Sequence, residues 1–136
     1  MSQMGRSTKK RILAVDDTAI ILTRISHTLR NDYDVITVNS GVRALKYLEQ
    51  EKPDLILLDI QMAQKDGIET LKDIRNMKDR EDIPVIMLTG VEDKDYVLAS
   101  AKLGICDYIL KPFSSSDLLD RISRVFEPEE KKDIEG

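Results

Sequence analysis

Five short runs of apolar residues recur along the chain, and apolar residues at helical spacing follow each of them. The runs cover residues 11–15, 34–38, 54–61, 84–88 and 106–110. A continuous apolar run, rather than an alternating one, is typical of a strand that helices cover on both faces, as in a parallel sheet. Parallel strands need long, right-handed crossovers between them. The pattern therefore predicts an α/β fold in which five strands alternate with five helices.

The helices are predicted from apolar stripes with a period near 3.6 residues. Thr18 and Ser40 are expected to cap the first two helices, and Gly104 to take a left-handed conformation just past the fourth. The expected core positions, in chain order, are Ile21, Leu22, Ile25 and Leu29; Val42, Leu45 and Leu48; Ile68, Leu71 and Ile74; Tyr96, Val97, Ala101 and Leu103; and Leu118, Leu119, Ile122, Val125 and Phe126.

Composition narrows the classes of protein. The length of 136 residues suits one domain, expected over 11–126, with polar ends at 1–10 and 127–136 that we expect to be disordered. A net charge of -4, from 21 basic and 25 acidic residues, offers no electrostatic footprint for nucleic acid or an anionic membrane. The single cysteine, Cys106, has no partner for an internal disulfide and is expected in the core. With no apolar run of membrane-spanning length and no signal peptide, we expect a cytoplasmic protein.

Chemically reactive side chains follow four of the five strands. Asp16 and Asp17 come directly after the first strand, Asp59 ends the third, Thr89 ends the fourth and Lys111 follows the fifth. In an open parallel sheet these ends share one edge, where ligands bind. Each residue taken singly is more often a turn former, a helix cap or a solvated side chain. Nothing about folding, however, requires these types at four strand ends together.

Three carboxylates at one edge call for a cation. Two of them about 5 Å apart repel by roughly 3 kcal/mol at an effective dielectric near 20. Mg²⁺ is the expected ion, because it prefers oxygen ligands and is commonly held by one or two carboxylates plus a phosphate oxygen. His27 is isolated and Cys106 lies in a strand, so no zinc site competes. With a phosphoryl group against Asp59, this carboxylate becomes a nucleophile that forms an acyl phosphate.

The chain resembles the receiver domains of response regulators in two-component signalling over about residues 11–126. The matching pieces are Asp16 and Asp17 after the first strand, Asp59 after the third, Gly67 in the following loop, Thr89 after the fourth, and the run from Tyr108 to Phe113. The resemblance implies a flavodoxin-like (βα)5 three-layer sandwich with strand order 2-1-3-4-5. It also implies a regulatory domain rather than an enzyme, one that assists its own phosphorylation and dephosphorylation.

By the same resemblance, Asp59 accepts a phosphoryl group from the phosphohistidine of a sensor histidine kinase or phosphotransfer protein. Asp17, Asp59 and the main-chain carbonyl of Gln61 would bind Mg²⁺, or Mn²⁺ in its place, with Asp16 acting through water. Lys111 and Thr89 would contact the phosphoryl oxygens.

The resemblance further implies a switch. Phosphorylation draws the hydroxyl of Thr89 inward, and the ring of Tyr108 turns toward the vacated space. The face made by the fourth helix, fifth strand and fifth helix then changes, and it engages an effector domain or protein, or a second copy in a homodimer. The Lys111–Pro112 peptide is expected to be cis. One departure is Ala63, where the family commonly has proline, and it predicts a less rigid loop after Met62. We expect this chain to be one piece of a longer regulator.

Two other classes of protein remain open. A haloacid dehalogenase-type phosphatase also uses an aspartyl phosphate and Mg²⁺, but it needs an Asp-x-Asp motif after its first strand and a cap domain. This chain has adjacent Asp16 and Asp17 instead.

The second alternative is a flavodoxin-like docking module without phosphorylation, in which Asp59→Asn would leave partner binding and its Mg²⁺ dependence unchanged.

Overall fold

The predicted alternation of strands and helices is confirmed in the computed structural model, which describes residues 9–90 and 94–127. The elements are β1 (Arg11–Val15), α1 (Ala19–Leu29), β2 (Asp34–Val38), α2 (Gly41–Gln50), β3 (Leu55–Asp59), α3 (Gly67–Arg75), β4 (Val85–Thr89), α4 (Lys94–Lys102), β5 (Asp107–Leu110) and α5 (Ser115–Phe126). The strands form one parallel sheet in the order β2-β1-β3-β4-β5, as expected. Most of the two expected disordered ends, 1–10 and 127–136, lies outside the described residues.

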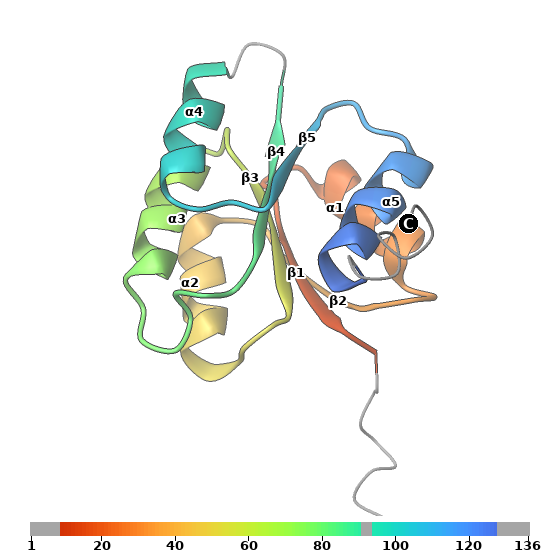
Figure 1. The fold of residues 1–136 in the computed structure, drawn as a ribbon, viewed down its shortest axis with the longest axis horizontal. Coiled ribbons are helices and arrows are strands. Elements are labelled where there is room, and N and C mark those ends of the chain that lie inside the picture. The colour runs from red at the N-terminus through yellow and green to blue at the C-terminus, as the bar shows by residue number, and fades with distance from the viewer. Residues whose placement is uncertain (1–8, 91–93, 128–136) are drawn as a thin grey trace, which may run out of the picture.

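The sheet is the middle of three layers. Helices α2, α3 and α4 cover one face, and α1 and α5 cover the other (Figure 1). Successive residues of β3 belong to different cores: Ile56 and Leu58 pack toward α2 and α3, whereas Leu55 and Leu57 pack toward α1 and α5. Both sets are fully buried. Because helices cover both faces of β3, neither set of alternating side chains contacts water, which explains its continuous apolar run.

Of the two predicted helix caps, Ser40 is confirmed and Thr18 is not. The hydroxyl of Ser40 accepts a hydrogen bond from the backbone N–H of Arg43 at 3.1 Å. Thr18 occupies the cap position of α1, but its side chain makes no capping hydrogen bond to the described chain. Its own N–H instead donates to Asp16 Oδ1 at 2.9 Å. The carboxylate of Asp16 therefore orders the start of α1, and the cap prediction for Thr18 was wrong.

The core prediction for α2 was wrong at Val42, whose side chain is half exposed. The buried ridge of this helix is Gly41, Ala44 and Leu48. At Gly41 the helix comes so close to α3 that a Cβ atom would overlap the hydroxyl of Thr70. Only glycine permits this approach, and it turns Val42 toward solvent.

Three further core predictions were wrong near β5, the last strand on that side of the sheet. Tyr96 and Ala101 are exposed, whereas Ser100 on the same helix is buried with its hydroxyl donating to the Tyr96 carbonyl at 2.7 Å. Cys106 is exposed rather than in the core, and it lies just before β5 rather than within it. Gly104 has the predicted left-handed conformation, with φ of 82°.

A partly buried network centres on Arg75, at the amino-terminal ends of β4 and β5 and so at the opposite end of the sheet from the reactive residues. Its guanidinium donates to the carbonyls of Glu81, Ile83, Leu103 and Gly104, at 2.6 to 3.1 Å. One side chain thereby joins the end of α3 to the segments that lead into β4 and β5. None of the described helices is long and apolar enough to cross a membrane.

Candidate functional site

The first and third strands bring three carboxylates together. Val15 pairs with Leu58 across the parallel ladder, so Asp16 follows β1 at the level where Asp59 ends β3. One oxygen from each of Asp16, Asp17 and Asp59 lies within 4.8 Å of the others. Asp16 and Asp59 are buried, and Asp17 is exposed. The predicted acidic cluster therefore forms, with one side open to solvent.

Lys111 enters this cluster from the loop after β5. Its ammonium group donates to Asp16 Oδ2 at 2.8 Å and to Asp59 Oδ1 at 3.0 Å. Burial alone lowers the pKa of this ammonium group, but the hydrogen bond to Asp16 and the charges of both carboxylates outweigh it and raise the pKa. The Lys111–Pro112 peptide is cis, as expected.

The charge of Asp59 is only partly balanced. Burial, followed by the charge of Asp16, raises the pKa of the Asp59 carboxyl from 3.8 to about 6, while Lys111 opposes the rise. The carboxylate is thus destabilised but still ionised at neutral pH. Such a poised, desolvated group in a cluster of charges is typical of a functional site.

The loop after β3 is held closely to the cluster. The backbone N–H of Ala63 donates to Asp17 Oδ2 at 3.1 Å, a bond that proline at this position could not make. Gly67 packs against the β3 end so tightly that a Cβ atom would overlap the Asp59 carbonyl and lie 2.8 Å from the Ile60 Cα. The hydrogen bond from Ala63 could not be foreseen from sequence, because it joins residues 46 positions apart.

Thr89 and Tyr108 lie on the two strands beyond β3. Thr89 is buried next to Leu88, the residue that pairs with Asp59, and its hydroxyl donates to the Gly90 carbonyl at 3.2 Å. The carbonyl of Thr89 accepts from the Lys111 backbone N–H at 2.7 Å. Tyr108 is 44% exposed on β5. Gln61 is exposed in the loop after β3.

No sequence pattern identified Arg24 as a residue that positions the segment after Lys111. Arg24, on α1, donates from its guanidinium to the Phe113 carbonyl at 2.7 Å, and the same group lies 5.3 Å from the centre of the Phe113 ring. It anchors the segment that follows Lys111 and Pro112. The residues involved are 89 positions apart, so no local pattern points to the contact.

The donor set fits a hard divalent cation. Three carboxylates supply only oxygen ligands, their oxygens lie within 4.8 Å of one another, and the open side leaves room for water. The single ammonium of Lys111 does not balance three negative charges. Mg²⁺ would relieve the remaining repulsion, with Asp16, Asp17 and Asp59 as the groups that hold it.

Comparison with known proteins decides the family. Residues 12–123 match the family model described as the response regulator receiver domain. The chain belongs to this family. Receiver domains take part in phosphotransfer in two-component systems, and they bind Mg²⁺ through a cluster of acidic residues. This receiver domain therefore belongs to a class of regulatory phosphoacceptor domains, which pair with histidine kinases and effector domains.

Individual relatives agree with the assignment. The receiver is 41% identical over 117 residues to the alkaline phosphatase synthesis transcriptional regulatory protein PhoP of Bacillus subtilis, covering 85% of this chain and 48% of that protein. It is 36% identical over 113 residues to the response regulator MprA of Mycobacterium leprae, covering 82% and 49% respectively. The chain thus spans about half the length of these curated relatives. Among solved structures, the chemotaxis response regulator CheY4 of Vibrio cholerae superposes with a TM-score of 0.81 at 31% identity, covering 87% of this chain and 99% of that one.

Proposed function

We propose that Asp59 is the phosphoacceptor of this receiver domain and that it takes its phosphoryl group from a phosphohistidine on a sensor histidine kinase or phosphotransfer protein. One observation carries the proposal: Asp59 ends the central strand β3, between the ends of β1 and β4, and its buried carboxylate lies within the acidic cluster and accepts from the ammonium of Lys111. Its pKa near 6 leaves it ionised, and therefore nucleophilic, at neutral pH.

The transfer is a displacement at phosphorus. An oxygen of Asp59 forms the new P–O bond as the P–N bond to the donor imidazole breaks, and the bonding electrons leave with that nitrogen. Lys111 already donates to Asp59 Oδ1, so its ammonium is close enough to move onto a phosphoryl oxygen as charge shifts there. The Thr89 hydroxyl would exchange its bond to the Gly90 carbonyl for one to the phosphoryl group.

A bound Mg²⁺, or Mn²⁺ in its place, would neutralise the phosphoryl oxygens during this step. Asp17 and Asp59 are its proposed direct ligands, with the main-chain carbonyl of Gln61 and with Asp16 acting through water. The hydrogen bond from Ala63 to Asp17 supports this assignment, because it holds the exposed carboxylate toward the cluster. The same groups would assist hydrolysis of the acyl phosphate, so the domain would act on its own phosphorylation and dephosphorylation.

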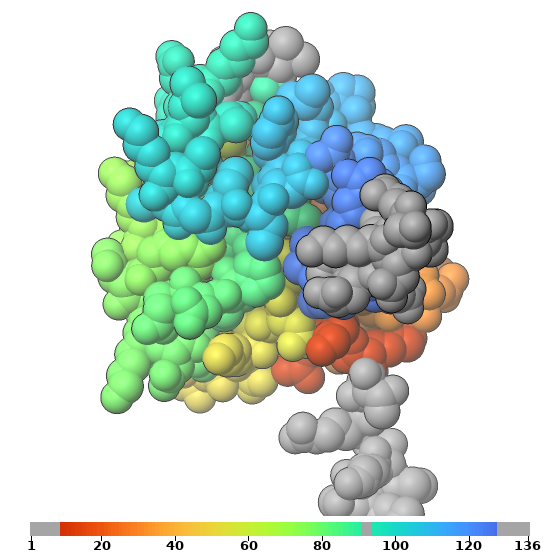
Figure 2. Space-filling model, in the orientation of Figure 1, coloured from red at the N-terminus to blue at the C-terminus, as the bar shows by residue number. Residues whose placement is uncertain are grey.

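The output surface is proposed to be the face formed by α4, β5 and α5. A groove of about 410 Å³ lies between α4 and β5, lined by Gly90, Lys94, Val97, Leu98, Tyr108 and Leu110. Leu98 and Leu110 are 66% and 49% exposed, so the groove presents apolar surface that a partner could bury. Figure 2 shows this face, with α4 beside β5.

Phosphorylation would act on this groove through Thr89 and Tyr108. Thr89 ends the strand that pairs with β5, and Tyr108 lines the groove. The phosphoryl group on Asp59, which itself carries a charge of about -1.5 to -2, would draw the hydroxyl of Thr89 inward and let the ring of Tyr108 follow. The partner on this face would be an effector domain or protein, or a second copy of the receiver in a homodimer. We propose that the domain acts in the cytoplasm, where histidine kinases present their phosphohistidine.

The proposal is tested by intact mass spectrometry after incubation with acetyl phosphate and Mg²⁺. We expect wild type to gain one phosphoryl group, and Asp59→Asn or addition of EDTA to prevent the gain. Asp54→Asn is the matched control, because Asp54 lies at the opposite end of β3 and accepts from the Arg11 backbone N–H. A phosphorylated Asp59→Asn variant would overturn the proposal. Rapid turnover of phosphate monoesters by wild type would favour a haloacid dehalogenase-type phosphatase instead.

A further inference from the structure

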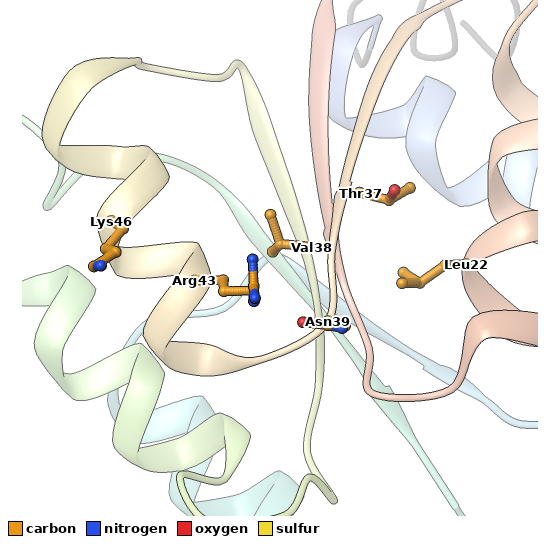
Figure 3. Close-up of a pocket in the computed structure, with 6 residues that line it drawn as sticks. All are labelled: Leu22, Thr37, Val38, Asn39, Arg43 and Lys46. Carbon is orange, nitrogen blue, oxygen red and sulfur yellow. The ribbon is translucent and has the colours of Figure 1, made fainter.

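A second surface lies at the other edge of the sheet, along β2. A hollow of about 390 Å³ is lined by Leu22 of α1, by Thr37, Val38 and Asn39 at the end of β2, and by Arg43 and Lys46 of α2. Figure 3 shows these side chains on both sides of the edge strand. A further hollow of about 280 Å³, which includes His27 and Arg30, shares Leu22 and Thr37 with the first. We call the two adjoining hollows together the β2-edge groove.

The β2-edge groove differs in charge from the rest of the protein. Its charged lining residues are all basic, namely Arg30, Arg43 and Lys46, together with the imidazole of His27. Neither hollow is lined by an aspartate or glutamate, although the chain as a whole has a net charge of -4. Within 9–90 and 94–127, the structure records no ion pair for any of these side chains. They are therefore available to an acidic ligand.

The backbone of β2 offers a second recognition element. β2 is an edge strand, paired only with β1 in the described sheet. The N–H of Asp34 donates to the Lys10 carbonyl and the Val38 carbonyl accepts from Asp16, so these alternate residues bond to the β1 side. By the same alternation, Val35 and Thr37 direct their N–H and C=O groups away from β1. An open edge of this kind can pair with an added strand.

We propose that the β2-edge groove binds an acidic polypeptide segment in an extended conformation, added to the sheet beside β2. Side chains of an added strand point alternately to the two faces of the sheet. One set would meet Arg43 and Lys46 on the α2 side, where glutamate or aspartate fits. The other set would meet Leu22 and Thr37 on the α1 side, where an apolar residue fits.

Two other occupants fit the groove less well. A second copy of this chain would bring the same cations face to face, which repels. Nucleic acid would satisfy the cations but could not complete the backbone ladder at Val35 and Thr37. An acidic peptide uses both features. Because β2 and β5 are opposite edges of the sheet, this surface is separate from the proposed output groove.

The test is an NMR titration of the ¹⁵N-labelled full chain with a blocked eight-residue peptide in which glutamate alternates with valine. We expect the largest amide shifts at Val35, Thr37 and their neighbours, slower exchange of those two amides with water, and weaker binding at higher salt. A peptide with glutamine in place of glutamate is expected to bind roughly tenfold more weakly or worse.

The decisive variant reverses both α2 charges, Arg43→Glu with Lys46→Glu. Both side chains are exposed, so the fold should survive, and its retention is checked by the amide spectrum. We expect at least a roughly tenfold loss of affinity for the glutamate peptide, whereas Lys102→Glu on α4 should change nothing. The proposal is overturned if the glutamine peptide binds equally well, if the β2 amides do not shift, or if single-stranded DNA competes for the same residues with equal affinity. The titration needs no phosphodonor, so its failure would leave the phosphoacceptor role of Asp59 intact.

Discussion

The ammonium of Lys111 lies 3.0 Å from Asp59 Oδ1, although 52 residues separate them in the chain. The parallel sheet makes this contact possible. β3 and β5 both pair with β4, and all three strands have their carboxyl ends at the same end of the sheet. The same ammonium group also donates to Asp16, so a cluster of three carboxylates contains a single ammonium group from Lys111. The site is therefore electrostatically unfavourable for folding until a further cation or a phosphoryl group with its metal enters it.

Stability should fall with rising pH because of Asp59. The folded protein holds this proton up to a pKa of about 6, whereas the unfolded chain releases it near 3.8. The folded state therefore binds more protons between these values, and stability falls as pH rises through this window and stays lower above it. In EDTA, Asp59→Asn should stabilise the protein by up to about 3 kcal/mol above pH 7, and by almost nothing below pH ~4.

Urea unfolding of both proteins at a series of pH values in EDTA measures this difference. Asp54→Asn should not reproduce it, because Asp54 lies at the other end of β3. A difference between wild type and Asp59→Asn that is constant across this range would contradict the assigned pKa.

Removing Lys111 should destabilise the protein more without metal than with it. In Lys111→Met, the carboxylates of Asp16 and Asp59 stay buried without their ammonium partner. We expect a loss of about 2 kcal/mol in EDTA at pH 7, discounted from the cost of breaking a fully buried pair because Lys111 is partly exposed. Saturating Mg²⁺ should recover much of this loss by neutralising the same acids. Equal losses with and without Mg²⁺ would show that the lysine acts only through packing.

Gly67 and Gly104 offer a matched pair of alanine substitutions. Gly67→Ala places a methyl group against the backbone of Asp59 and Ile60, so we expect roughly 2–3 kcal/mol of destabilisation and weaker Mg²⁺ binding. Gly104→Ala meets no atom within 4 Å but forces alanine to a φ of 82°. It should cost about 1–2 kcal/mol and leave Mg²⁺ affinity unchanged. Thermal unfolding and calorimetric Mg²⁺ titration of both variants check this; equal Mg²⁺ affinities would refute the role given to Gly67.

Arg75→Met should destabilise the fold without altering the site. The variant leaves four backbone carbonyls without their guanidinium donor, and we expect a loss of roughly 2–4 kcal/mol. Arg124→Met is the control, since among residues 9–90 and 94–127 the ion pair of Arg124 is an exposed one with Asp120 on α5, and its loss should cost less than about 0.5 kcal/mol. Chemical unfolding gives both values. A loss for Arg75→Met no larger than for Arg124→Met would mean that the network contributes little.

The sheet and the acidic cluster were predictable because both depend on local signals. The inner strands β1, β3 and β4 are nearly continuous apolar runs. Each reactive residue stands at the carboxyl end of a strand or directly after it, and the parallel topology brings these ends together. The positions that sequence misassigned depend on how neighbouring elements approach each other. Val42 is exposed because the contact of Gly41 with Thr70 sets the rotation of α2.

Hydrogen bonds between residues far apart in the chain could not be predicted from sequence patterns either. The contacts of Ala63 with Asp17 and of Arg24 with Phe113 join distant segments, and no periodicity predicts them. Cys106 illustrates a third limit. Its residue type favours burial, but it precedes an edge strand that helices cover incompletely, so its side chain is exposed.

The most direct test of the account is to map the phosphorylated residue. After incubation with acetyl phosphate and Mg²⁺, borohydride would reduce an acyl phosphate to an alcohol, and tandem mass spectrometry of the digested chain would locate it. The account predicts a single modified position, Asp59, and none when EDTA replaces Mg²⁺. Modification of Asp16 or Asp17 in place of Asp59, or equal modification of Asp59 without a divalent ion, would contradict it.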